Sequence, residues 1–340
     1  MVIAVDIRFS DEYQNFVFES FKRITKQHPS HSFIFIFDKP HDPSFIFSEN
    51  VTAVVVKPQN ISLLNDLKTS SLLKKHTVDI FVTGKTLSQT KVPQCLIAYD
   101  KITATSLKRT RVIISDSEFS KKEIIEKYKI ADDKIDIVYK GVNENFKPIH
   151  FKGKEKIKEQ YANGNEYFLV AGAIPSENYF LNLLKAFSAF KKMQKSNMQL
   201  LIATDVEVAT KSLEKLRSFK FKDEVKLLAK LPKEKFVAIM GASYAFVYPF
   251  AQDYLFALQA MKCDTPLVVN SNGALPEICS DAALYVHPES HKNIADKMML
   301  IFKDEELRQQ LIEKGSQLVK KYSWENIAGS LWNCIEKACR

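Results

Sequence analysis

Short apolar runs alternate with amphipathic helical patterns along most of the chain, and this alternation restricts the fold more than any other feature. In the first part of the sequence, helical patterns separate several of the runs, as at residues 15–27 and 120–127. Continuous apolar strands separated by helices are typical of a parallel sheet that helices cover on both faces. The strands expected here are Val2–Asp6, Phe33–Phe37, Val51–Val56, Ile80–Val82, Cys95–Ala98, Val112–Ser115 and Ile135–Tyr139.

A break in the pattern follows at residues 140–164. Lys140–Pro148 contains Gly and Pro, and His150–Gly164 is polar and rich in Lys. The alternation then begins again, which indicates a second doubly wound domain. Strands are expected at Tyr167–Ala171, Gln199–Ala203, Val225–Leu228, Ala245–Tyr248 and Leu267–Asn270. Helices are expected at Phe180–Lys192, Val206–Ser218, Lys233–Met240 and Leu255–Met261, and from Asn270 to the end.

The two blocks predict an α/β fold of two doubly wound, Rossmann-like domains that face each other across a cleft. We expect residues 1–148 to form the first domain and residues 149–322 the second. Ligands of open α/β sheets bind beyond the carboxyl ends of the strands, so a ligand is expected in that cleft.

The composition excludes several classes of protein. Hydrophobic residues make up 46% of the chain, and no run approaches the ~20 apolar residues of a membrane-spanning helix. Asp6 follows the first apolar run too early for a secretory signal. The Cys residues are odd in number and have no Cys-x-x-Cys pair, and the His residues show no metal-ligand spacing. We therefore expect a cytoplasmic protein without a disulfide framework, metal site or cofactor.

Positive charge is concentrated in one segment of a chain whose net charge is +9. Between Lys68 and Arg111, nine basic residues stand against two acidic ones. Two interpretations remain open: a solvated surface with surplus Lys, or a patch that faces an anionic lipid head group or sugar phosphate. Nucleic acid is not expected as a partner, because no nucleic-acid motif or aromatic interleaving accompanies the charge.

Several segments in the second half carry a family likeness. They include SDSEFSKKEIIEKY at Ser115–Tyr128 and IVYKGVNENFKP at Ile137–Pro148. Further ones follow in order at Tyr167–Phe190, Tyr244–Pro249, Ala260–Pro266, Ser271–Pro288 and Asp304–Ala328. Together they resemble glycosyltransferase family 4, whose members are retaining enzymes with the GT-B fold. The likeness covers about residues 112–335.

The resemblance implies that the chain transfers a hexose from a nucleotide-diphosphate sugar to a sugar or lipid-linked acceptor, without a metal. The sequence contains neither Asp-x-Asp, the usual metal-diphosphate motif of other glycosyltransferases, nor a P-loop. By the same resemblance, the first domain is the acceptor side and the second the donor side. The last helix, 323–340, is expected to return to the first domain through the apolar face of Trp324, Ile327, Ala328, Leu331, Trp332 and Ile335.

The family's first donor motif is altered here. In the family, a turn after the first strand of the second domain places an Arg and a Lys against the donor phosphates. Gly172 and Asn178 keep their places in that motif, but Ser176 and Glu177 stand where the cations would be. A carboxylate there repels a diphosphate by on the order of 1 kcal/mol or more. Either the Ser176 hydroxyl binds phosphate, or this is an ordinary turn in which Ser176 or Asn178 caps the next helix.

A second donor motif, in which two Glu residues flank a Gly-containing loop, is also changed. Gln259 occupies the second Glu position and can still accept a hydrogen bond from a ribose hydroxyl. Bulky Tyr254, Leu255 and Phe256 replace the loop that offers backbone amides. They are expected to fill space that a donor would occupy, and a closed pocket and an open one both remain as interpretations.

Other family positions supply weaker candidates. Tyr99 and Asp100 stand where the family has His and Asp facing the reacting sugar, and Arg8–Asn15 does not match its Gly-rich acceptor loop. The turn after the strand at 267–270 is well preserved. By resemblance its residues Ser271, Asn272, Gly273 and Glu277 lie near the donor, although the turn also suits a simple strand-to-helix connection.

Two functions therefore remain open. The first is a nucleotide-sugar hexosyltransferase, which the resemblance favours. The second is a catalytically inactive homologue that acts as a binding or regulatory partner, because the substitutions fall in the loops that carry the chemistry.

Overall fold

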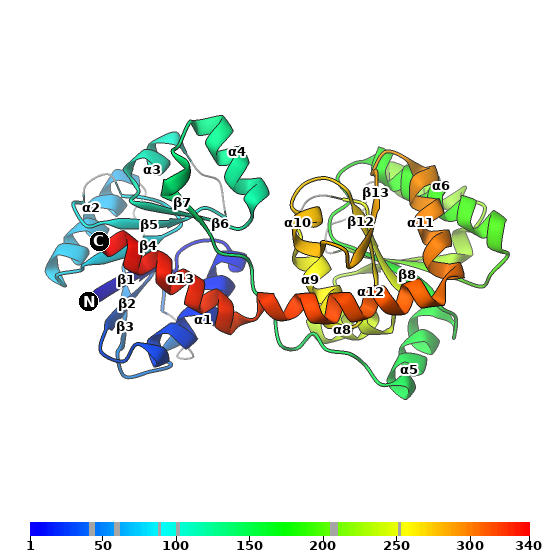
Figure 1. Cartoon of the computed structure of the whole chain (residues 1–340), viewed down its shortest axis with the longest axis horizontal. Helices are drawn as coiled ribbons and strands as arrows, with labels where there is room; N and C mark the ends of the chain where they lie inside the picture. Colours follow the sequence, from blue (N-terminus) through cyan, green and yellow to red (C-terminus); the bar gives the residue numbers. More distant parts are fainter. Residues whose placement is uncertain (41–44, 58–61, 88–89, 100–102, 205–209, 251–252) are drawn as a thin grey trace. The chain divides into compact units, whose positions relative to one another are not determined.

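The computed structural model describes residues 1–40, 45–57, 62–87, 90–99, 103–204, 210–250 and 253–340. The chain forms two compact units, shown in Figure 1. Unit 1 comprises Met1–Gly141 and Tyr322–Arg340, and unit 2 comprises Val142–Lys321. The second unit therefore begins at Val142, whereas the sequence analysis expects the second domain to begin at residue 149. The reason is Phe146, which is buried and packs against Phe236 of unit 2 with ring centroids 6.3 Å apart.

The described strands of unit 1 form a parallel sheet in the order β3-β2-β1-β4-β5-β6-β7. Its central strand β1 pairs with β2 on one side and β4 on the other, so the strand order reverses there. The strands are β1 (Val2–Asp6), β2 (Ser32–Phe37), β3 (Val51–Val55), β4 (Ile80–Thr83), β5 (Gln94–Ile97), β6 (Val112–Ser115) and β7 (Ile135–Ile137). The helices are α1 (Asp11–Gln27), α2 (Ser62–Lys75), α3 (Ala104–Arg109) and α4 (Glu118–Tyr128), with a 3-10 turn at Asp132–Lys134.

Unit 2 contains a second parallel sheet, in the order β10-β9-β8-β11-β12-β13. Here the order reverses at β8, which pairs with β9 and β11. The strands are β8 (Tyr167–Ala171), β9 (Gln199–Thr204), β10 (Val225–Ala229), β11 (Ala245–Tyr248), β12 (Leu267–Asn270) and β13 (Ala283–Val286). The helices are α5 (Phe151–Ala162), α6 (Glu177–Gln194), α7 (Thr210–Arg217), α8 (Lys233–Ala242), α9 (Leu255–Lys262), α10 (Leu275–Cys279), α11 (His291–Lys303) and α12 (Glu305–Leu318), with 3-10 turns at Lys222–Glu224 and Val319–Tyr322.

Two elements differ from the sequence prediction. Helices alone were expected after residue 270, but β13 forms the edge of the second sheet. Its apolar run is only four residues long, too short to separate from its helical surroundings by periodicity. The polar segment after Pro148 was expected to be a break, but much of it is helix α5. Its few apolar residues include Ala162, which is fully buried.

The last helix, α13 (Trp324–Cys339), belongs to the core of unit 1. Figure 1 shows it as the red helix beside α1, and contacts between these two helices are extensive. Its apolar face is buried: Ile327 is 3% exposed, and Leu331 and Ile335 are 0% exposed. The Trp332 ring stacks on His28, at the end of α1, with centroids 3.7 Å apart. Thus the two ends of the chain fold into one core.

We expect substitutions in α13 to change the stability of unit 1 in opposite directions. Leu331→Ala removes a fully buried side chain and should lower the free energy of unfolding by about 2–5 kcal/mol. Gly329→Ala should raise it by about 1 kcal/mol, because a Cβ at this helical position meets nothing within 4 Å. Both Trp residues of the chain, Trp324 and Trp332, lie on α13, so fluorescence during urea unfolding reports on unit 1. Equal loss of stability in both variants would contradict this packing.

Candidate functional site

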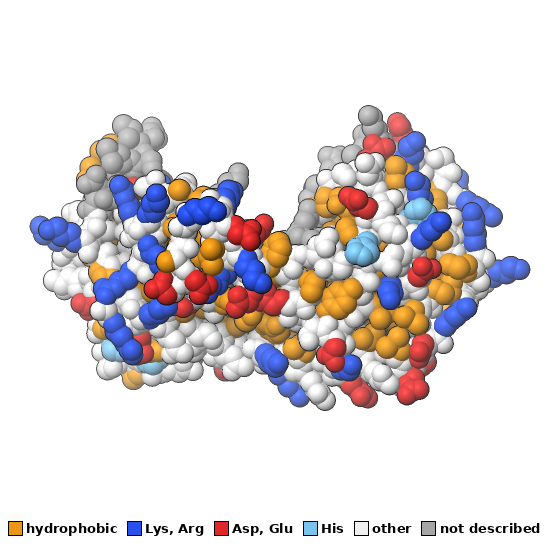
Figure 2. Space-filling model, turned by 45° about the horizontal axis from the view of Figure 1, so that its top comes forward, with side chains coloured by type: hydrophobic (Ala, Val, Ile, Leu, Met, Phe, Trp, Pro, Cys, Tyr) orange, Lys and Arg blue, Asp and Glu red, His pale blue; other side chains and the backbone are white. Residues whose placement is uncertain are grey.

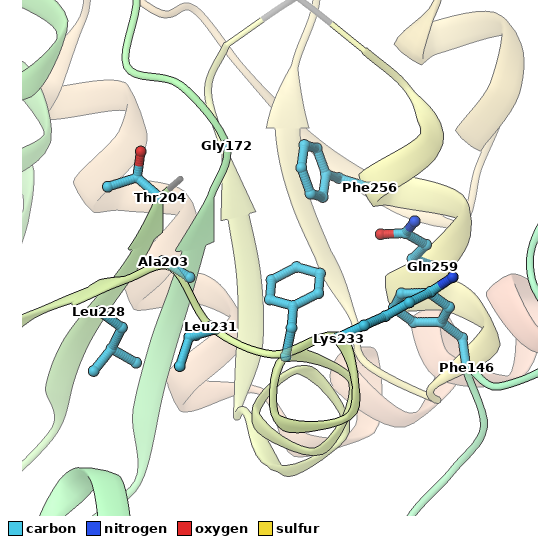
Figure 3. Close-up of a pocket in the computed structure, with 10 residues that line it drawn as sticks. Phe146, Gly172, Ala203, Thr204, Leu228, Leu231, Lys233, Phe256 and Gln259 are labelled. Atoms are coloured by element: carbon cyan, nitrogen blue, oxygen red, sulfur yellow. The ribbon is translucent and has the colours of Figure 1, made fainter. Parts of the chain in front are cut away.

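A cavity of about 270 Å³ opens at the carboxyl edge of the sheet in unit 2. It lies beside β8, where the strand order reverses, which is the position at which open α/β sheets bind ligands. Its walls come from the ends of β8, β9 and β10, from helices α8 and α9, and from the segment that leads into unit 2 (Figure 3). The lining residues are Phe146, Gly172, Ala203, Thr204, Leu228, Leu231, Lys233, Phe236, Phe256 and Gln259.

Gly172 and Phe256 lie close together in the wall of this cavity. Gly172 follows the last residue of β8 and has φ +92°, which disfavours any residue with a side chain. A Cβ on Gly172 would lie 3.0 Å from Cε2 of Phe256. The Phe256 ring also packs near Tyr248 and Phe236, with centroids 5.7 and 6.0 Å away. An aromatic cluster therefore holds the ring in place.

Of the three bulky residues in this loop, only Phe256 lines the cavity. Its ring forms part of the wall. Tyr254 does not: it is 4% exposed, immediately precedes α9 and packs into unit 2 away from the cavity lining. Leu255 also lies outside that lining. The remaining volume is slightly below the ~300–1,000 Å³ of common small-molecule sites, so the cavity fits part of a ligand.

Gln259 presents an unpaired hydrogen-bond acceptor in this cavity. Its Oε1 is buried and has no hydrogen-bond partner among the residues that the structure describes. Figure 3 shows the amide oxygen pointing toward the interior, on the side of Phe256. A buried acceptor left without a donor costs about 1–3 kcal/mol. A ligand hydroxyl or N–H group that donates to Oε1 would recover this energy.

Lys233 is a lining residue that the sequence does not single out. It is the first residue of α8, follows Pro232, and is exposed to solvent. A cation at this position faces the same cavity as Gln259 and can attract a negatively charged ligand. Nothing in the sequence distinguishes it from the many other surface Lys residues, since its position depends on how α8 packs beside β8 and β9.

Ser176 and Glu177 lie at the start of α6 and are not part of the cavity lining. Ser176 is at the N-cap position, but its side chain makes no capping hydrogen bond. The helix begins at Glu177, so Asn178 lies inside it and is not the cap that the sequence allowed. The Glu177 carboxylate is favourable in the first helical turn, where the helix dipole is positive.

The turn after β12 is held by its own hydrogen bonds. Asn270 is buried, and its Oδ1 accepts from the amide of Asn272 at 2.8 Å. Ser271 Oγ lies 3.3 Å from Nδ1 of His287, and Gly273 has φ +76°. Glu277 is in the first turn of α10. These residues share the carboxyl edge with Gly172, but β11 separates β12 from β8, and none of them lines the cavity.

Tyr99 forms a hydrogen bond and a ring contact within unit 1. Its hydroxyl donates to the carbonyl of Val138 at 2.6 Å, and its ring packs edge-on against Phe16 at 4.9 Å. The hydroxyl proton is therefore already used in the fold. Asp100, its partner in the sequence prediction, lies outside the described residues.

Thus the structure gathers only part of the predicted site. Gly172 and Gln259 share one cavity with Phe256, whereas Ser176 and the turn after β12 lie elsewhere on the same edge. Among the residues described, no group of three or more His, Cys, Asp or Glu could hold a metal ion.

Comparison with known sequences identifies related proteins for much of the chain. Residues 151–318 match the model of the family described as glycosyl transferases group 1. The chain is 24% identical over 237 residues to the O-antigen chain mannosyltransferase RfbU of Salmonella typhimurium, which covers 68% of this chain and 62% of that protein. It is 26% identical over 241 residues to an uncharacterised glycosyltransferase of Methanocaldococcus jannaschii, covering 66% and 60%. The chain therefore spans about three fifths of these curated relatives.

Solved structures match over nearly the whole chain. A glycosyltransferase from Rickettsia africae aligns with a TM-score of 0.80 at 16% identity, covering 99% of this chain and 98% of that one. Anabaena HepE in complex with UDP and glucose aligns with a TM-score of 0.74 at 12% identity, covering 99% of both chains. At these identities the likeness shows the fold. The chain has the two parallel-sheet, Rossmann-like α/β domains of GT-B glycosyltransferases, and the sequence comparisons support a glycosyltransferase.

Proposed function

We propose that this protein transfers a hexose from a nucleotide-diphosphate sugar to a sugar or lipid-linked acceptor. The observation that carries the proposal is the cavity in unit 2, with the unpaired Oε1 of Gln259 inside it. Unit 2 then binds the donor and unit 1 the acceptor. Because RfbU, a relative in sequence, is a mannosyltransferase, mannose is the hexose we propose first.

The walls of the cavity suit the nucleoside part of such a donor. Phe146, Phe236 and Leu231 offer apolar surface against which a planar base can pack. Gln259 Oε1 can accept a hydrogen bond from a ribose hydroxyl. The limited volume accommodates the nucleoside, so the diphosphate and sugar would extend along the carboxyl edge toward the turns after β8 and β12.

The diphosphate leaving group needs its negative charge neutralised during transfer. In this chain Lys233 supplies one cation at the cavity, and the amides at the helix N-termini of this edge can supply partial positive charge. We propose that no metal takes part, on the basis of the family resemblance and the missing Asp-x-Asp motif. The same resemblance supports retention of configuration at the transferred sugar.

A second function has specific support: a catalytically inactive homologue that binds and regulates another protein. Two observations favour it. Glu177 stands in the turn where the family has a cation, and the Phe256 ring lies against Gly172 where a donor phosphate would approach. Both features oppose diphosphate binding, one through charge and the other through shape.

Gln259→Met tests the role of the unpaired oxygen. The free protein should lose no stability in circular-dichroism unfolding, because Oε1 has no partner to lose. Affinity for UDP or GDP, measured by titration calorimetry with ADP as the third nucleotide, should fall by about 1 kcal/mol, roughly fivefold. Gln310→Met on α12 is the matched control. If the wild type binds none of the three nucleotides, the enzyme proposal fails and the inactive homologue is favoured.

Restoring the family's cations should strengthen nucleotide binding. We expect Ser176→Arg with Glu177→Lys to raise UDP or GDP affinity, since each charge-assisted contact contributes about 1.5–3 kcal/mol. Gln310→Arg with Glu306→Lys on α12 changes the net charge equally and serves as the control. An equal gain in both pairs would mean that only overall charge matters. No gain in the first pair would place the diphosphate away from the start of α6.

The basic segment Lys68–Arg111 provides a candidate contact with anionic membranes. Its described basic residues are all exposed, and Lys101 lies outside the described part. Lys91, Arg109 and Arg111 line a cavity of about 410 Å³ at the amino ends of β5 and β6, opposite the carboxyl edge of the sheet. Figure 2 shows Lys and Arg side chains over both units, so surplus charge is not confined to this segment.

No helix in the described residues is long and apolar enough to cross a membrane. We propose a cytoplasmic, membrane-peripheral location.

We expect the protein to pellet with phosphatidylglycerol vesicles and to be released as salt rises, because screening shortens to ~8 Å at 0.15 M. Arg109→Glu with Arg111→Glu should weaken pelleting strongly, since each basic residue contributes about 1 kcal/mol near an anionic surface. Lys152→Glu with Lys156→Glu, exposed on α5, is the matched control. Equal pelleting with neutral phosphatidylcholine vesicles would remove the electrostatic explanation.

A further inference from the structure

A second polar cavity, of about 230 Å³, opens in unit 1 at the carboxyl ends of β1, β2 and β4. It lies beside β1, where the strand order of this sheet reverses. Its polar lining includes Asp6, Arg8, Asp38, Asn65, Asp66 and Lys85. The segment Arg8–Asn15, which does not match the family's acceptor loop, thus contributes to a different polar site.

An ion pair fixes the guanidinium of Arg8 in the wall of this cavity. Its Nε donates to Oδ1 of Asp6 and its Nη2 to Oδ2, both at 2.7 Å. Nη2 also donates to Oγ1 of Thr69 at 3.1 Å, and Thr69 is fully buried on α2. Burial lowers the pKa of Arg8, but the bonds to Asp6 and the charges of Asp6, Asp38 and Asp66 raise it above its ordinary value. The guanidinium is therefore charged and rigid, and its Nη1 makes no hydrogen bond within the described residues.

Two further carboxylates in the lining act on Arg8 through their charge but keep their oxygens available for hydrogen bonds. Neither Asp38, after β2, nor Asp66, on α2, forms a hydrogen bond or ion pair with any part of the chain that the structure describes. The ion pair between Asp6 and Arg8 is complete without Asp38 and Asp66, so these two carboxylates are not needed to balance the charge of Arg8. The cavity thus combines two available acceptors with one fixed donor.

The charges indicate the chemical class of ligand. Three carboxylates in the lining repel an anion, and Arg8 together with Lys85 repels a divalent cation. A neutral molecule with several hydroxyls avoids both penalties. Its hydroxyls can donate to Asp38 and Asp66 and accept from Arg8 Nη1, and the Phe9 ring, also in the lining, can cover an apolar face.

We propose that this cavity binds a monosaccharide unit through Asp38, Asp66 and Arg8. The assignment of this sugar to the acceptor rests on the proposed function. The proposal that the cavity binds a sugar is independent of that function. The site is built into unit 1 alone, because all of its lining residues come from the segment 6–87.

Saturation-transfer NMR on the full chain tests this proposal, with the methyl α-glycosides of mannose, glucose and galactose as probes. At least one glycoside should receive saturation, and Asp38→Ala with Asp66→Ala should weaken its binding by about tenfold or more. Glu123→Ala with Glu126→Ala, two exposed carboxylates on α4 of the same unit, should leave binding unchanged. Trp fluorescence during unfolding checks that both double variants keep unit 1 folded.

Three results would overturn the proposal: no transfer to any of the glycosides, equal binding by Asp38→Ala with Asp66→Ala and the wild type, or competition by inorganic phosphate. Calorimetry with UDP and GDP separates this proposal from the proposed function. The Asp38 and Asp66 substitutions should leave nucleotide affinity unchanged. Glycoside binding without nucleotide binding would support the sugar site and contradict the proposed transferase function. Nucleotide binding without glycoside binding would support the transferase function and contradict the sugar site.

Discussion

The constraint on which this structure depends is the burial of parallel strands on both faces. Strands such as β1, β6 and β8 are almost wholly apolar, because helices cover each side of the sheet and water reaches neither. In these strands the polar and charged residues, such as Asp6 and Ser115, therefore lie where the strand ends. Both candidate cavities open at carboxyl ends, each beside the strand at which the order of its sheet reverses. The polar residues of each candidate cavity therefore come mainly from the loops and helices that follow the strands.

The loops of unit 2 form a cavity with a largely apolar wall. Gly172 retains the positive φ that lets the chain turn sharply after β8. Phe256 lies beside it in the cavity wall and packs in an aromatic cluster with Tyr248 and Phe236. Gln259 keeps an acceptor without a negative charge. A ligand bound here would depend on apolar contact and neutral hydrogen bonds more than on ion pairs.

In unit 1 charged residues, and not apolar ones, dominate the cavity lining. Two of these charged residues, Asp6 and Arg8, form an ion pair, and Phe9 supplies aromatic surface beside them. The unit also depends on a distant part of the chain, because α13 completes its core after unit 2 has ended. Unit 1 therefore cannot be complete until the end of the chain has been added, whereas unit 2 is continuous in sequence.

The sequence by itself determined the two parallel sheets and all of their described strands except β13. Runs such as Val112–Ser115 and Tyr167–Ala171 are continuous and apolar, and local pattern is enough to identify them. It also identified Gly172 and Gln259 by family resemblance. Only the tertiary structure decided which side chains meet. Lys233 lies far in sequence from Gly172, and Asp66 lies far from Arg8, although each pair lines one cavity. No local periodicity distinguishes Lys233 or Asp66 from other surface charges. Their position depends on the packing of α8 and α2 against the sheets, which is a long-range property of the fold.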